Sequence, residues 1–142
     1  MFVWIRQFSK IYQNVSADAI WSLWSDIDNW HEWNPGIEYC KLNGAFAKGS
    51  NFTLKSKGGP EVTIDLIEVD RPKKFTDCTR FPGAKMYGMH EIEFVDEGIK
   101  LITTMKVEGW LSYLWIFLVV KKIVAKIPEQ TDNLVALARK NT

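Results

Sequence analysis

The chain has 142 residues, of which 46% are hydrophobic and 25% charged, and its net charge is +1. This length and composition predict one soluble globular domain, residues 1–142, that is large enough to bury a sizeable core. Lys and Arg are spread along the chain, so it lacks the basic patch that a nucleic-acid partner would require. The excess is aromatic, with seven Trp, eight Phe and four Tyr, and an aromatic-lined pocket is one use for such residues.

Cofactor and metal sites are not indicated. The two cysteines, Cys40 and Cys78, form neither a metal-binding spacing nor a disulfide framework, and no glycine-rich phosphate loop is present. The first residues place Arg6 after a short apolar run and offer no small-residue cleavage site, so we expect no signal peptide and a cytoplasmic location.

The first part of the chain predicts one strand and two short helices. Residues 2–14 are rich in aromatic and β-branched residues, which favours a strand. Ser16 is a good helix N-cap, and the apolar residues from Ile20 to Ile27 recur at helical spacing. A second short helix is expected around residues 30–33, ended by Pro35-Gly36.

From Ile37 onward the pattern changes to about six strands. Short β-type runs are separated by turn residues, and several of them alternate apolar and polar positions. Connections this short between successive strands indicate an antiparallel meander.

Residues 110–140 predict a long C-terminal helix. Its second half has one apolar face and one polar face, whereas residues 110–120 are apolar nearly all round. Pro128 lacks an amide donor and predicts a kink or restart near Ile127. The apolar run is too short for a membrane-spanning helix, which needs roughly 20 residues, and Lys121 and Lys122 end it.

Together these elements predict an α+β fold in which a curved antiparallel sheet of about seven strands wraps around the long helix. The sheet must cover its apolar face, and the terminal helix is the only element long enough to do so. We expect an apolar pocket of roughly 300–1,000 Å³ between them.

The sequence resembles the START and Bet v 1-like helix-grip superfamily, in particular its polyketide cyclase/dehydrase-like branch. The first similar stretch, residues 14–37, runs from the strand exit through Trp21 and Asp26 to Trp33-Asn34-Pro35. Further similar stretches are residues 49–52, 69–75, 90–109 and 134–140, so the resemblance covers essentially the whole chain. It implies a hydrophobic cavity between sheet and helix that binds lipids, sterols, polyketides or other apolar molecules, and in a few members catalyses cyclisation or dehydration.

Three functions remain open. Binding of an apolar small molecule is favoured over a cyclase- or dehydratase-like enzyme, and the third is a protein-interaction module that uses the apolar face of the terminal helix. The expected partner is therefore a hydrophobic small molecule, and a monomer is favoured over a homodimer.

The candidate site residues follow from strand parity and from the resemblance. His90 shares parity with Ile92 and Phe94 and is the candidate acid or base, although a structural histidine is favoured; Asp77 is the candidate carboxylate. For Asp65 and Asp77 alike, an orientation toward water is favoured over one toward the cavity. The expected ligand-binding residues are Met86, His90, Ile92, Phe94, Met105, Tyr113, Phe117 and Val120.

Trp115 and Leu118 lie on the side of the terminal helix that becomes polar further along, so the sheet cannot cover them. We expect the Trp-rich turn at residues 30–33 to cover both, in preference to a second subunit or a membrane surface.

Overall fold

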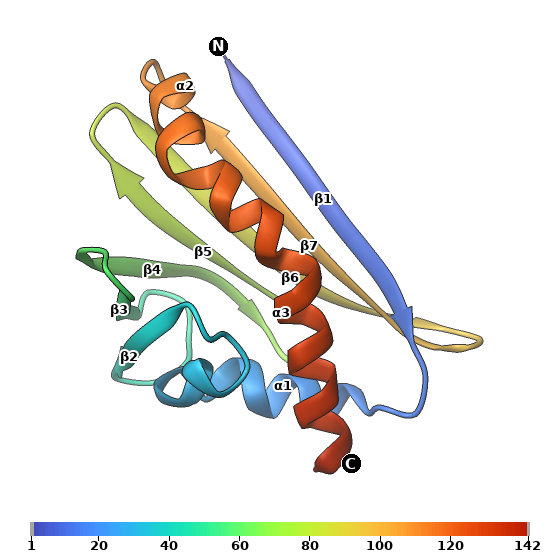
Figure 1. The fold of residues 1–142 in the computed structure, drawn as a ribbon. Helices are drawn as coiled ribbons and strands as arrows, with labels where there is room; N and C mark the ends of the chain where they lie inside the picture. Colours follow the sequence, from blue (N-terminus) through green and yellow to red (C-terminus); the bar gives the residue numbers. More distant parts are fainter. Residues whose placement is uncertain (1, 142) are drawn as a thin grey trace.

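The computed structural model describes residues 2–141 and confirms the predicted α+β helix-grip architecture (Figure 1). The elements in chain order are β1 (Val3–Tyr12), α1 (Ala17–Ser25), η1 (Ile27–Glu32), β2 (Ile37–Asn43), β3 (Asn51–Ser56), β4 (Glu61–Asp70), β5 (Lys74–Phe81), β6 (Ala84–Val95), β7 (Gly98–Glu108), α2 (Ser112–Trp115), η2 (Ile116–Val120) and α3 (Lys121–Lys140).

The seven strands form one antiparallel sheet in the order β1-β7-β6-β5-β4-β3-β2. Consecutive strands from β2 to β7 pair as neighbours, as their short turns require, and β1 closes on β7 from Val3 opposite Glu108 to Tyr12 opposite Ile99. Figure 1 shows the long helix crossing one face of this sheet, with α1 and η1 near its C-terminal end. We call the sheet face beneath the helix the inner face.

Helix α1 begins as its sequence predicts. The Ser16 hydroxyl oxygen accepts a hydrogen bond from the Ala19 amide at 3.1 Å, which satisfies one of the free donors at the helix start. Trp30 of η1 is buried, and its indole N–H donates to the Trp24 carbonyl at 3.0 Å, so the short helices are fixed to one another by a buried hydrogen bond.

The terminal helix does not restart at Pro128, because α3 continues through it from Lys121 to Lys140. Its buried face packs on both sides of this residue, at Ile127 toward its N-terminal side and at Leu134 toward its C-terminal side, and this packing holds the helix together. The irregular turn lies earlier, where η2 is a π-helix. Such π turns insert an extra residue and change which side chains share a face.

The core consists of two hydrophobic clusters along the helix. Cluster 1 joins α1, η1 and the C-terminal half of α3 to every strand of the sheet, and includes Trp24, Phe75 and Leu134. Cluster 2 joins η2 and the start of α3 to β6 and β7, and includes Met105 and Val120. The residues between the two clusters on the inner face are therefore of interest as a site.

Candidate ligand-binding site

A group of polar side chains separates the two hydrophobic clusters at the centre of the inner face. Strand pairing places Phe75 opposite His90, and His90 opposite Thr103. The next pairs along the strands place Asp77 opposite Gly88 and Thr79 opposite Met86. We call Asp77, Thr79, His90 and Thr103 the polar band; none of them belongs to either cluster.

His90 and Asp77 form the chemical centre of this band. The His90 Nε2 atom lies 3.2 Å from the Asp77 Oδ2 atom, and the two side chains are only 22% and 13% exposed. The imidazole stacks on the Phe75 ring, with centroids 4.4 Å apart and planes inclined by 13°, and makes a T-shaped contact with the Trp24 ring, with centroids 6.0 Å apart. The histidine ring is thus held in one orientation by an aromatic wall and a carboxylate.

Asp77 was expected to face water, and that expectation is wrong: its carboxylate points onto the inner face beside His90. Asp65 does lie on the outer side of the sheet, where its carboxylate is 3.3 Å from Arg80. Strand β5 is buried on both faces at Thr76, Cys78 and Thr79, so alternation of polarity could not reveal which face Asp77 takes.

Two further residues that sequence reasoning missed shape the site. A Cβ atom at Gly88 would lie 2.8 Å from the Asp77 Oδ1 atom, so glycine provides the space that the carboxylate occupies. The Thr79 hydroxyl is buried and has no hydrogen-bond partner among the described residues. An unpaired buried hydroxyl normally costs stability, which makes it a candidate contact for a ligand oxygen or nitrogen. Thr79 follows Asp77 by two residues in β5 and therefore lies on the same face of the sheet; this spacing could have identified it as a site residue.

The expected apolar ligand contacts divide into two groups. Met86, Met105 and Val120 are buried in cluster 2, and Ile92 is buried in cluster 1. These four residues therefore flank the polar band and supply the apolar surroundings of the His90–Asp77 pair.

Phe94, Tyr113 and Phe117 are placed differently from the expectation, because their side chains are 66%, 71% and 72% exposed. Phe94 keeps the parity of His90 but pairs with Ile99, close to the turn of the β6–β7 hairpin, which extends beyond the helix in Figure 1. Phe117 is on the outward side of the terminal helix, and Tyr113, although mostly exposed, stacks on the Phe2 ring with centroids 4.3 Å apart; Ser112, Ile116 and Val120 occupy the buried side.

The cover over Trp115 comes from the β5–β6 turn and not from residues 30–33. The Trp115 ring stacks on Phe81 with centroids 4.7 Å apart, and its indole N–H donates to the Pro82 carbonyl at 2.8 Å. Leu118 stays 48% exposed. The antiparallel pairing of β5 with β6 brings their turn to the end of the sheet where α2 begins, which sequence spacing alone could not specify.

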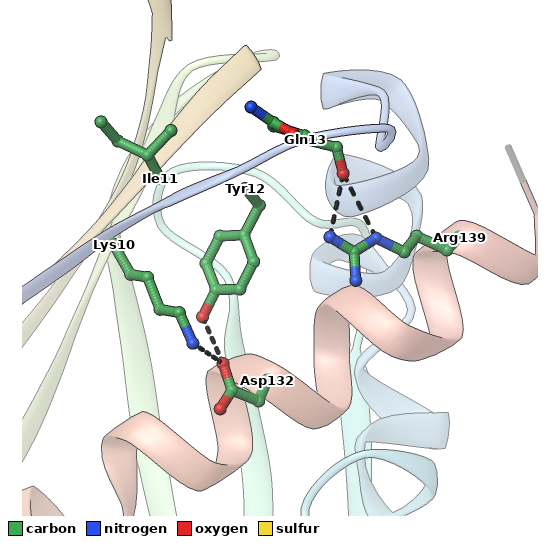
Figure 2. Close-up of a pocket in the computed structure, with 6 residues that line it drawn as sticks. All are labelled: Lys10, Ile11, Tyr12, Gln13, Asp132 and Arg139. Atoms are coloured by element: carbon green, nitrogen blue, oxygen red, sulfur yellow. Dashed lines mark hydrogen bonds and ion pairs between the residues drawn. The ribbon is translucent and has the colours of Figure 1, made fainter. Parts of the chain in front are cut away.

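A surface depression of about 400 Å³ lies where β1 ends against α3 (Figure 2). The Asp132 carboxylate there accepts hydrogen bonds from Tyr12 at 2.7 Å and Lys10 at 3.0 Å, while Arg139 donates to the Gln13 carbonyl at 2.9 Å. These bonds lower the pKa of Asp132, and burial together with the Asp132 contact raises the pKa of Tyr12. We call this hydrogen-bonded group the polar clasp. We interpret it as a structural link between β1 and α3, because its donors and acceptors are already hydrogen-bonded to one another.

A second depression, of about 330 Å³, is lined by Ile92 with the charged and apolar residues around it on β4–β7. No group of three or more His, Cys, Asp or Glu in residues 2–141 is arranged to hold a metal ion. Within the same residues, no helix is both long and apolar enough to cross a membrane.

Comparison with known proteins identifies the family. Residues 9–139 match the model of the family described as polyketide cyclase / dehydrase and lipid transport. No curated protein has a sequence that matches the chain.

Several solved structures share the fold. The di-domain aromatase/cyclase StfQ from the steffimycin biosynthetic pathway has a TM-score of 0.77 and 13% identity over 98% of this chain and 51% of its own. Norcoclaurine synthase from Thalictrum flavum, in complex with dopamine and hydroxybenzaldehyde, has a TM-score of 0.71 and 14% identity over 99% and 88%. Protein NE0264 from Nitrosomonas europaea has a TM-score of 0.73 and 12% identity over 96% and 95%. At these identities the likeness establishes the fold alone, whereas the family match covers most of the chain: the protein belongs to the polyketide cyclase/dehydrase and lipid transport family.

Proposed function

We propose that the protein binds an apolar small molecule that carries at least one hydrogen-bonding group, with that group at the His90–Asp77 pair. The observation that carries the proposal is the position of this pair: it lies on the inner face of the sheet, between two hydrophobic clusters, and both side chains retain some exposed surface. A fully apolar ligand would cover those polar atoms of His90 and Asp77 that do not bond to each other and would leave them without partners, which is costly in a buried site.

The surroundings of the pair support a mostly apolar ligand. Phe75 and Trp24 flank the imidazole on one side, and Met86 and Met105 belong to the cluster on the other. Methionine side chains have three rotatable bonds and adapt to ligands of irregular shape. The unpaired Thr79 hydroxyl adds a second hydrogen-bonding group next to this region. The family description and the ligands named for norcoclaurine synthase are consistent with a small organic molecule.

The test is to load the purified protein with a total lipid extract of its own host, identify what is retained by mass spectrometry, and measure its affinity for variants. His90→Gln removes the imidazole and should weaken binding by about 5- to 150-fold, as expected for a lost buried hydrogen bond of 1–3 kcal/mol. His31→Gln is the matched control, because His31 lies exposed in η1 and far along the chain from the pair. An affinity change below threefold for His90→Gln would remove His90 from the site.

The His90–Asp77 geometry also favours a second function, a dehydratase- or cyclase-like enzyme in the same place. With Asp77 Oδ2 as the hydrogen-bond acceptor, His90 carries its ring proton on Nε2, which leaves Nδ1 to accept a proton from a carbon next to a carbonyl group. In a dehydration the protonated imidazole would return its proton to the departing hydroxyl group, which leaves as water while the carbon–carbon double bond forms; in a cyclisation the carbon anion would bond to a second carbonyl carbon, whose oxygen takes up the electron pair and that proton. With a β-hydroxy ketone substrate, a rate that follows one ionisation and disappears in His90→Gln supports the enzyme; binding without turnover supports the binding module.

A further inference from the structure

The start of the terminal helix presents an apolar surface that the described residues leave largely open, although the Tyr113 ring stacks on Phe2 with centroids 4.3 Å apart. The exposed large side chains are Trp110 at 83%, Tyr113 at 71%, Leu114 at 46%, Phe117 at 72% and Leu118 at 48%. Their exposure, together with the burial of Ser112, Ile116 and Val120, places them along one outward stripe that starts just before α2 and continues through η2. Lys121 and Lys122, both exposed, continue the stripe by one turn. We call these seven residues the helix-tip face.

The charges around this face are almost all positive. Between Gly109 and Pro128 the chain has three lysines and no acidic residue, and residues 78–89, which include the covering β5–β6 turn, contain Arg80 and Lys85 and no acidic residue. Glu108, at the border, already accepts a hydrogen bond from the Tyr87 hydroxyl at 3.0 Å and lies 3.7 Å from Lys106.

The opposite end of the sheet is mixed in charge. The β6–β7 hairpin contains Glu91, Glu93, Asp96 and Glu97 within seven residues, but Lys74 lies opposite Glu91 and Lys100 lies opposite Glu93. The excess of positive charge around the helix-tip face is therefore a local feature.

We propose that the helix-tip face docks on the surface of a lipid bilayer that contains anionic headgroups. Aromatic and leucine side chains at a helix start insert at the boundary between headgroups and acyl chains, and adjacent lysines extend to the phosphates. Each lysine near an anionic surface adds affinity, so Lys121 and Lys122 favour the orientation in which the helix-tip face meets the membrane. The helix lies on the membrane and does not cross it.

A bilayer explains the face better than a second copy of the chain does. A two-fold dimer with its helices parallel would bring Lys121 and Lys122 of both copies together, and like charges at an interface oppose association; a dimer with its helices antiparallel would leave these lysines at the two ends of the contact, without an acidic partner. An anionic lipid surface instead neutralises the same lysines. The proposal is independent of the interior ligand, because docking uses only residues on the outward side of the helix.

Vesicle co-sedimentation tests the proposal with two kinds of vesicle: phosphatidylcholine alone, and equal parts of phosphatidylcholine and phosphatidylglycerol. The wild type should bind the anionic vesicles at low salt, bind less as salt screens the charges, and bind the neutral vesicles at least tenfold more weakly. Trp110→Ser/Phe117→Ser and Lys121→Glu/Lys122→Glu should each weaken anionic binding by about tenfold or more.

The chain offers matched controls for both variants. Phe94→Ser removes an equally exposed aromatic side chain from the β6–β7 hairpin, and Lys48→Glu/Lys140→Glu makes the same charge change at exposed positions outside the helix-tip face. Both controls should bind as the wild type does, and thermal melts verify that every variant is folded. Equal binding to both vesicle types would overturn the proposal, and so would an equal loss of binding in the Phe94 control. The proposal would also be overturned if the wild type binds no vesicles and sediments as a dimer that the Phe117 change dissociates.

Discussion

The packing of Gly88 against Asp77 gives a sharp test of the site, because one methyl group should displace the carboxylate. A Cβ atom at position 88 would lie 2.8 Å from Asp77 Oδ1, 3.1 Å from Oδ2 and 3.2 Å from Cγ. The carboxylate would have to move by about 0.6 Å to reach the 3.4 Å at which ordinary contact begins. Since the His90 Nε2–Asp77 Oδ2 distance is already 3.2 Å, we expect a shift of this size away from His90 to end the hydrogen bond.

The expected magnitude follows from two opposing effects. A lost hydrogen bond to a charged group costs about 1.5–3 kcal/mol, whereas Gly→Ala at a compatible backbone conformation gains about 0.4–1 kcal/mol through the unfolded chain. Gly88 has no positive φ, so the backbone accepts alanine. Gly88→Ala should therefore lower the free energy of unfolding by about 1–2 kcal/mol.

A double-mutant cycle followed by urea denaturation isolates the cause. In an Asp77→Ala background the carboxylate is absent, so Gly88→Ala should become neutral or stabilising by up to about 1 kcal/mol. Gly59→Ala is the matched control, since its Cβ would meet only Ser56 at an ordinary distance of 3.4 Å, and its effect should be the same in both backgrounds. If Gly88→Ala costs the same with and without the Asp77 carboxylate, the contact does not act as described.

Three further predictions concern the rest of the fold. Trp115→Glu loses its contacts with the β5–β6 turn and should lower the free energy of unfolding by about 2–4 kcal/mol without changing the molecular mass in solution. Phe117 is exposed, so Phe117→Glu should change the free energy of unfolding by no more than about 0.5 kcal/mol. Urea denaturation measures the stability of both variants, and analytical ultracentrifugation measures their mass. Because the pKa of Tyr12 is raised in the folded protein, the stabilising effect of this residue is complete below its ordinary pKa of 10 and is lost as pH rises toward the folded value. Because the pKa of Asp132 is lowered, the stabilising effect of Asp132 is complete above 3.8 and is lost as pH falls. Tyr12→Phe should therefore flatten the alkaline limb of a stability–pH curve, and an unchanged limb would contradict the clasp. Burial raises the pKa of the Cys40 thiol to about 12, so it should react with Ellman's reagent at pH 8 only after unfolding.

The fold could be predicted from the sequence because its elements have strong local patterns. The Ser16 cap, the alternating strands from Ile37 and the amphipathic second half of the terminal helix each specify one structure, and their order leaves one way to cover the sheet. The pairing of Trp115 with Phe81 could not be predicted, because it depends on where the β5–β6 turn lies in space.

The candidate site was predictable in part. His90 has the same strand parity as Ile92, and this placed it on the inner face. Phe94 has the same parity too, but there the strand has passed beyond the helix, so alternation along the strand could not show where burial ends. Asp77 lies in a strand that is buried on both faces, where polarity does not alternate with orientation.

Native mass spectrometry of the protein isolated from its own host tests the central claim most directly. We expect a bound organic molecule that adds mass to the polypeptide, that is released by organic solvent, and that is retained less by Asp77→Ala than by wild type. Asp65→Ala, which alters a carboxylate on the outer side of the sheet, should retain it fully. A bare polypeptide mass for the wild type, unchanged after incubation with the host's lipid extract, would contradict the proposed ligand site.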